Sequence, residues 1–305
     1  MIWQKTLARP LKFSGIGLHL GTTVSVSIHP AQANHGLRFV RTDLPGRPGV
    51  QAHYSRVVDT TRATTLGEGQ ATISTVEHLL AALWGMGVDN ALIQVDGPEL
   101  PIMDGSAAPF ARVFRDTGLR SLPWPRAFML IQRPVELEDG DQWIRVSPGQ
   151  PEITYNIDFP HPLIKSQRFT IPLRSESFRQ EIAPARTFGF LKEVQYLQAK
   201  GLALGGSLDN AVVLDDAGVV NPEGLRFPTE FVRHKILDAV GDMALLGQPL
   251  LGRLEVRRGS HNLHYRFIKK LMKQESAWRL WVPNRRTGQT SQPRLSTLLW
   301  EGARA

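Results

Sequence analysis

The stretch FVRHKILDAVGD, residues 231–242, repeats polar side chains at intervals of one helical turn within an otherwise apolar segment. At about 100° per residue on a helical wheel, His234, Asp238 and Asp242 share one stripe. The opposite side of the wheel is apolar and carries Val232, Ile236, Val240 and Met243. This spacing predicts one long amphipathic helix over residues 230–246.

The polar stripe of this helix has two interpretations. It is compatible with the solvent-exposed face of an amphipathic helix, which is the common reason for such spacing. Phe231 and Leu245 project into the same sector, however, and a half-buried His234 is costly unless it is paired or binds something. Side chains at positions i and i+4 can also bind one metal ion, while the third orients another residue. Spacing alone leaves both interpretations open.

Both halves of the 305-residue chain combine strand patterns with helical segments. In the first half, alternation predicts strands at residues 22–30 and 91–97, and helical spacing predicts helices at residues 74–90 and 106–118. The second half repeats this plan, with expected strands at residues 127–148, 152–159 and 210–216 and helices near residues 190–201 and 230–246. The sequence therefore predicts an α+β protein of two similar two-layer domains.

The expected domain boundary lies where Pro123 and Pro125 interrupt the chain. We predict an N-terminal domain over residues 1–122 and a C-terminal domain over residues 126–282. Residues 283–305 are polar and are expected to form a loosely held tail.

Composition narrows the classes of function. Hydrophobic residues make up 42% of the chain and charged residues 21%, and no apolar run approaches the roughly 18 residues of a membrane span. We therefore expect a globular cytoplasmic protein. Because the chain has no cysteine, any metal must be bound by histidine and carboxylate. The net charge of +8 predicts an anionic partner, which is a nucleic acid, a phosphorylated substrate or an acidic membrane surface.

A second candidate group lies in STVEHLLAAL, residues 74–83. Ser74 and Glu77 have the spacing of a capping box, so Glu77 is compatible with a purely structural role at the start of a helix. His78 is likewise compatible with an ordinary half-buried histidine. A glutamate beside a metal-binding histidine is also how zinc hydrolases place a general base. That function would require this helix to meet the one that carries His234.

A third candidate is His261 in RRGSHNLH, residues 257–264. Gly259 and Ser260 place it at the start of an expected helix, where an imidazole can face a cleft, although a surface histidine in a basic loop fits equally well. His19 in GIGLHLG is isolated, and spacing gives it no chemical role. The glycine-containing stretches GIGLHLG and GLALGGSLDN lack the Lys-Ser/Thr ending of a P-loop and the dinucleotide-binding spacing. We therefore exclude a P-loop NTPase and a Rossmann-type dinucleotide-binding protein.

Six ordered motifs together resemble one known family. They are STVEHLLAAL, MDGSAAPF, ARTFGF, GLALGGSLDN, FVRHKILDAVGD and GSHNL, and the resemblance extends from GIGLHLG to about ESAWRLWV. The chain closely resembles the UDP-3-O-acyl-N-acetylglucosamine deacetylase (LpxC) family, zinc enzymes of lipid A synthesis. The resemblance implies two sheet-and-helix domains with the active site between them and an acyl-chain tunnel in the second domain. It also implies hydrolysis of the N-acetyl group of a UDP-linked acylated glucosamine.

The resemblance also assigns roles to residues of this chain. It implies Zn²⁺ bound by His78, His234 and Asp238. The catalytic residues that it implies are Glu77 as general base, His261 as the acid oriented by Asp242, Thr187 at the oxyanion, and Lys235 beside the site. The substrate-binding residues that it implies are Phe159, Phe188, Lys192 and Arg258, with apolar tunnel residues Leu191, Ala203 and Leu208.

Some positions depart from the family pattern. Gln142 in EDGDQW replaces a frequent lysine, which removes an expected diphosphate contact, and His264 replaces an asparagine. Arg258 retains a basic charge near the expected diphosphate. Acyl-chain length cannot be deduced from the tunnel residues.

Two rival functions remain on the sequence alone. One is a zinc amidohydrolase with another acylated amine as substrate. The other is a basic nucleic-acid-binding protein, but no known binding motif or alternation of aromatic and basic residues supports it. We therefore expect a UDP-linked substrate, no nucleic acid, transient contact with the inner membrane surface, and a monomer.

Overall fold

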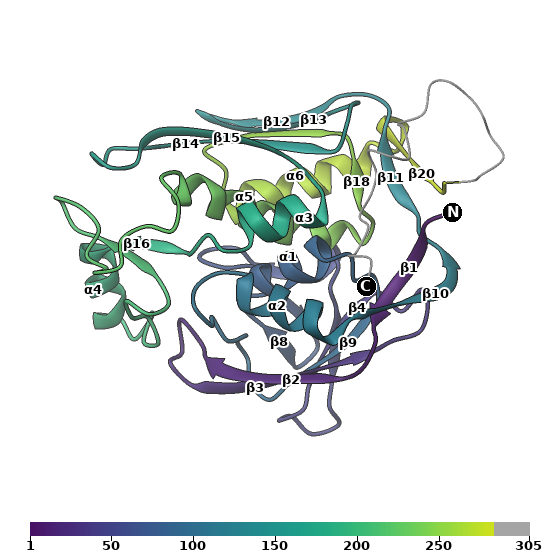
Figure 1. Ribbon diagram of the computed structural model, residues 1–305, viewed down its shortest axis with the longest axis horizontal. Coiled ribbons are helices and arrows are strands. Elements are labelled where there is room, and N and C mark those ends of the chain that lie inside the picture. The colour runs from purple at the N-terminus through teal and green to yellow at the C-terminus, as the bar shows by residue number, and fades with distance from the viewer. Residues whose placement is uncertain (284–305) are drawn as a thin grey trace.

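Residues 1–283, which the computed structural model describes, contain two five-stranded sheets that face each other across a layer of helices (Figure 1). Helices α1 (Glu77–Gly85) and α2 (Ala108–Thr117) lie toward one sheet, and α5 (Glu230–Met243) and α6 (His261–Lys273) toward the other. The α+β class expected from the sequence is confirmed. Apart from Pro283, the tail predicted at residues 283–305 lies outside the described residues.

The first sheet is formed by strands whose side chains alternate between the core and the surface. In β3, Val24, Val26 and Ile28 are buried, whereas the residues between them are only partly covered. The order across this sheet is β2 (Leu11–Ile16), β3 (Thr23–Pro30), β9 (Ala91–Val95), β4 (Leu37–Arg41) and β5 (Gly49–Gln51).

The second sheet has the same plan. Its order is β12 (Val135–Asp139), β13 (Gln142–Ser147), β19 (Arg253–Arg257), β14 (Glu152–Phe159) and β15 (Lys165–Pro172). In both sheets, the last strand in sequence occupies the centre, antiparallel to the second strand and parallel to the third. This shared topology confirms the expectation of two units of similar plan, although the residue limits of the domains stay a prediction.

Each unit carries an insertion between the fourth strand of its large sheet and a central helix, which is α1 in the first unit and α5 in the second. In the first unit this is a small sheet of β6 (Val57–Asp59), β7 (Thr65–Glu68) and β8 (Ala71–Ile73). In the second unit it comprises α3 (Ser175–Ser177), a π-helical turn (Phe178–Ile182), β16 (Phe188–Phe190), α4 (Leu191–Ala199) and β17 (Val212–Leu214). These insertions supply much of the wall of the cavity described below.

Two smaller ladders accompany these sheets. They are β1 (Trp3–Leu7) with β10 (Leu119–Pro125), and β11 (Phe128–Ile131) with β18 (Leu250–Leu251) and β20 (Trp278–Trp281). Pro123 and Pro125, which were expected to interrupt the chain, are part of β10. Proline is tolerated there because a two-stranded ladder leaves one edge of each strand unpaired.

Helices α1 and α5, which occupy equivalent places in the two units, pack directly against each other. Every residue of α1 is buried, and so are His234, Asp238 and Asp242 of α5. The solvent-exposed interpretation of the polar stripe is therefore wrong. The predicted helix at residues 230–246 is confirmed as α5 followed by a 3₁₀ turn at Ala244–Leu246. Among the described residues, no helix is long and apolar enough to cross a membrane.

The close approach of α1 and α5 depends on Gly241. A Cβ atom at this position would overlap the backbone carbonyl of Glu77, which cannot move without displacing α1. We expect Gly241→Ala to lower the free energy of unfolding by about 1 to 3 kcal/mol, even though alanine has the better helix propensity. Urea unfolding measures this change.

The matched control is Gly218→Ala, where the added Cβ meets only Leu163 at 3.6 Å. Gly218 is not in the left-handed region, so this substitution tests glycine replacement without overlap. Equal unfolding free energies for the two variants would show that the helix crossing does not require a glycine.

Candidate active site

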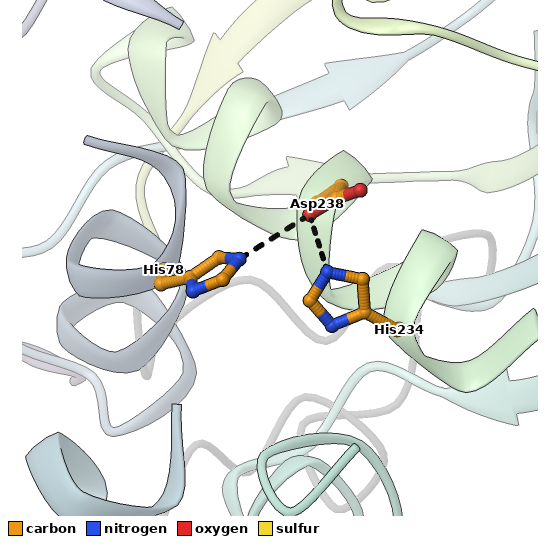
Figure 2. A group of neighbouring side chains, drawn as sticks. All are labelled: His78, His234 and Asp238. Atoms are coloured by element: carbon orange, nitrogen blue, oxygen red, sulfur yellow. Dashed lines mark ion pairs between the residues drawn. The ribbon is translucent and has the colours of Figure 1, made fainter. Parts of the chain in front are cut away.

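Two imidazoles and one carboxylate converge where α1 meets α5 (Figure 2). His78 comes from the first turn of α1, and His234 and Asp238 come from successive turns of α5; their exposed fractions are 5%, 3% and 4%. The Nε2 atoms of His78 and His234 lie 3.7 and 3.3 Å from Oδ1 of Asp238. Ligand atoms each about 2.0 to 2.2 Å from a tetrahedral ion are separated by about 3.3 to 3.6 Å. The three side chains therefore fit one metal ion.

The surroundings of His234 and Asp238 leave one atom of each side chain available to a metal ion. Nδ1 of His234 donates to the carbonyl of Ala185 at 3.1 Å, which leaves the Nε2 lone pair free. Burial lowers the pKa of His234 to about 4, so its imidazole is neutral. Burial alone would raise the pKa of Asp238, but the ammonium of Lys235 holds it well below the usual range. Lys235 donates to Oδ2 at 2.7 Å, so Oδ1 remains for the ion.

Glu77 precedes His78 at the start of α1. Its Oε2 accepts a hydrogen bond from the backbone N–H of Thr64 at 2.9 Å. The helix begins after Val76 and has no side-chain cap, so the predicted capping box with Ser74 is wrong. Burial raises the pKa of Glu77. Its carboxylate is therefore a stronger base than an ordinary glutamate, and it lines the same cavity as His78.

A second buried group surrounds Asp242, one turn beyond Asp238. Its Oδ1 accepts from the hydroxyl of Thr64 at 2.6 Å, and its Oδ2 accepts from Nδ1 of both His261 and His264 at 2.8 Å. A nitrogen-to-oxygen distance of 2.8 Å is that of a direct hydrogen bond and is shorter than the separation of two ligands around one ion. This group is therefore a hydrogen-bonded network.

The network sets the charge of His261. Burial alone would lower the pKa of this imidazole, but the carboxylate of Asp242 overrides burial and raises it to about 9. The pKa of Asp242 is held below its ordinary value, chiefly by His261, despite the opposing effect of burial. An imidazolium and a carboxylate therefore coexist at neutral pH, and the imidazolium borders the cavity.

The cavity beside these groups has a volume of about 900 Å³. Four of the residues expected to act on substrate or transition state line it: Phe159, Thr187, Phe188 and Lys235. The expected tunnel residues also line it, together with other apolar side chains of the second insertion: Leu191, Val194, Leu197, Ala203, Leu208 and Val213. The metal-binding group and an apolar compartment are thus parts of one space.

Two predicted substrate-binding residues lie outside this cavity. Arg258 pairs with Asp141 and borders a separate pocket of about 290 Å³ that also includes Arg168 and Arg257. The side chain of Lys192 is 77% exposed and pairs with Asp216 at 2.6 Å. The structure brings neither residue to the metal-binding group.

Sequence reasoning missed Thr64, which bonds to both Glu77 and Asp242. It lies in a loop of the first insertion, where no periodicity or motif indicates such contacts. His19, to which no role was given, lines the cavity, and burial lowers its pKa. His264 was noted only as a departure from the family pattern, because a single residue in a helix gives no sign of its partners.

Comparison with known proteins agrees with this geometry. The family model described as "LpxC: UDP-3-O-acyl N-acetylglycosamine deacetylase" matches residues 4–273. The chain belongs to the LpxC family. The resemblance inferred from the six motifs is thereby confirmed.

Several LpxC relatives are similar over nearly their whole length. UDP-3-O-acyl-N-acetylglucosamine deacetylase from Geobacter sp. (strain M21) is 47% identical over 281 residues, which cover 92% of each protein. The enzyme of the same name from Myxococcus xanthus (strain DK1622) is 46% identical over 93% of this chain and 90% of the relative. The enzyme of the same name from Anaeromyxobacter dehalogenans (strain 2CP-C) is 44% identical over 96% of this chain and 94% of the relative.

Proposed function

We propose that this LpxC family member hydrolyses the N-acetyl group of UDP-3-O-(3-hydroxyacyl)-N-acetylglucosamine, giving acetate and the free amine. This reaction is the committed step of lipid A biosynthesis, the lipid anchor of lipopolysaccharide. The observation that carries the proposal is the convergence of His78, His234 and Asp238 beside the acid–base pair Glu77 and His261. The names of the relatives support the same substrate.

We further propose that the metal is Zn²⁺, bound by His78, His234 and Asp238. Two neutral imidazoles and one carboxylate are typical ligands of catalytic zinc. Bound zinc supplies Lewis acidity, which makes a water molecule more acidic and polarises a carbonyl group.

Two side chains beside this site carry out the proton transfers, one as the base and the other as the acid. Glu77 accepts the proton of the water that attacks the acetyl carbon. As the C–O bond forms and the C–N bond breaks, His261 donates a proton to the sugar nitrogen so that a neutral amine leaves. Asp242 keeps His261 charged before that step.

In this proposal, Thr187 and Lys235 stabilise the developing oxyanion, and their position at the cavity supports that role. Thr187 borders the cavity and its backbone N–H is bonded to the carbonyl of Gly105 at 2.8 Å, so the loop that carries it is fixed. The ammonium of Lys235 also borders the cavity while it bonds to Asp238. A single oxyanion donor typically contributes about 10² to 10³ in kcat.

The substrate-binding roles of Phe159 and Phe188 are supported by their position in the wall of the cavity, whereas those of Arg258 and Lys192 rest on the family resemblance. The apolar compartment suits the acyl chain, and the rings of Phe159 and Phe188, 5.7 Å apart, form a surface for the sugar and nucleoside. Arg258 and Lys192 are proposed to contact the phosphates, for which the net charge of +8 is favourable. We expect a cytoplasmic monomer. We also expect transient contact with the inner membrane, because the substrate joins a nucleotide to an acyl chain.

The acid role of His261 predicts the alkaline side of the pH profile. Because the pKa of His261 is raised to about 9, the proton needed by the leaving amine is lost only above that pH. We expect kcat/KM to fall above about pH 9. In Asp242→Asn the negative charge that raises the pKa of His261 is absent. The alkaline limb of the pH profile should therefore move to lower pH, toward the ordinary histidine pKa of 6.5. An unmoved limb in this variant would argue against the Asp242–His261 pair as its source.

One combined experiment tests the proposed function. Elemental analysis of the purified protein should find about one zinc ion per chain, and acetate should be released from UDP-3-O-(3-hydroxyacyl)-N-acetylglucosamine. If zinc is bound but this substrate releases no acetate, the protein is a zinc amidohydrolase that acts on another acylated amine. If no metal binds, the proposal is wrong.

A further inference from the structure

His264 is a buried histidine that the proposed mechanism does not use. It lies one turn after His261 on α6, and its side chain has no exposed surface. Its Nδ1 is 2.8 Å from Oδ2 of Asp242, the same oxygen that accepts from His261. Two imidazoles on one helix therefore share one carboxylate oxygen, and only one of them borders the cavity.

The partners of His264 define its protonation. A carboxylate only accepts hydrogen bonds. Nδ1 of His264 is therefore protonated and donates a hydrogen bond to Asp242. Nε2 lies 3.3 Å from the hydroxyl of Tyr155, which is fully buried on β14. Because the proton of the ring is on Nδ1, Nε2 accepts a hydrogen bond from this hydroxyl. Burial also lowers the pKa of His264, so the ring is neutral while His261 carries the charge. The hydrogen bonds thus form a chain from Tyr155 through His264 to Asp242.

The same pair supports the loop that leads to His261. A Cβ atom at Gly259 would overlap the hydroxyl of Tyr155 and would lie 2.9 Å from Nε2 of His264. The backbone of Gly259 therefore rests directly on these two side chains. The next residue, Ser260, caps α6 by accepting from the N–H of Leu263 at 3.2 Å. The position of the first turn of α6 depends on this packing.

We propose that His264 is a positioning residue, which holds the Asp242 carboxylate in the orientation that aims His261 into the cavity. Oδ1 of Asp242 is fixed by Thr64, and Oδ2 is fixed by the donors on α6. Without His264, this buried oxygen has only His261 as a donor, so the carboxylate is held less firmly in the orientation that aims His261 into the cavity. The inference rests on the proposed role of His261 as the acid.

The test compares two substitutions of nearly equal size. In His264→Asn, the side-chain amide nitrogen occupies the place of Nδ1 and still donates to Asp242. In His264→Leu, the volume is similar but the donor is lost. Both variants lose the same contact with Tyr155, so they differ chiefly in the hydrogen bond to Asp242.

We expect His264→Leu to lower kcat by about 10- to 100-fold, the usual cost of removing an outer partner of a site, with KM nearly unchanged. His264→Asn should recover most of this loss. Both variants should retain the metal content of the wild-type protein, because neither alters His78, His234 or Asp238. A recovery by asparagine is not expected if His264 merely fills space.

Equal losses in the two variants, or wild-type kcat in His264→Leu, would overturn the proposal. If the leucine variant does not fold, Tyr155→Phe tests the chain of hydrogen bonds from its other end by removing one hydroxyl. It should lower kcat severalfold at unchanged KM, and an unchanged kcat would again overturn the proposal. A parallel His261→Ala variant keeps the two ideas apart, because full activity in that variant would refute the acid role of His261 itself.

Discussion

Replacing His78 with alanine is expected to remove the tightly bound metal and to lower kcat/KM by more than about 10³-fold, which corresponds to several kcal/mol of lost transition-state stabilisation. The two remaining side chains, His234 and Asp238, both come from α5 and provide too few ligands for a catalytic zinc site. His78 is the member of the group supplied by α1, so its replacement removes the contribution of the first unit to the metal site.

Metal content after dialysis and initial rates of acetate release measure this effect. His29→Ala is the control, since His29 is a half-buried histidine of the same unit on β3 and is not part of the group formed by His78, His234 and Asp238. The control should retain metal and activity. A His78→Ala protein with a full complement of zinc would show that this histidine is not a ligand.

Replacing Glu77 with glutamine is expected to separate catalysis from metal binding. The amide cannot accept the proton of the attacking water, so kcat should fall by about 10² to 10⁴. Its oxygen can still accept the hydrogen bond from the Thr64 N–H, so the start of α1 and the adjacent His78 should stay in place. The variant should therefore bind as much metal as the wild-type protein.

The control for the loss of one negative charge is Glu255→Gln, because Glu255 is a half-buried carboxylate on β19. The control should keep its turnover, and its unfolding temperature should match that of Glu77→Gln within a few degrees. Normal turnover in Glu77→Gln would leave Glu77 with only a structural role. Loss of metal in that variant would instead place Glu77 among the groups that maintain the metal site.

Part of the site was predictable because it depends on local geometry. The repeat of His234, Asp238 and Asp242 at four-residue spacing fixes their common face once the segment is helical. The same holds for His261, which Gly259 and Ser260 place at the start of a helix. The order of six motifs then identified the family, which assigned to these residues roles that spacing alone had left open.

Other features depend on contacts that no local pattern records. Ser74 and Glu77 have the spacing of a capping box, yet Glu77 bonds to Thr64 of a preceding loop. Pro123 and Pro125 suggested an interruption but lie within a strand. His264 was only a departure from a pattern until its bonds to Asp242 and Tyr155 were visible. In each case the deciding partner is distant in the chain.

The α+β plan and the stripe on α5 could be deduced from the order of residues, because hydrophobic periodicity and helical spacing are properties of neighbouring residues. That the stripe faces α1 and not solvent depends on how the two helices pack. Gly241 allows the two helices to approach closely enough for His78 to join His234 and Asp238. Burial at that crossing keeps the imidazole of His234 neutral, and the neighbouring Lys235 keeps Asp238 ionised despite its burial, since the free energy of a charge depends on the medium and partners around it.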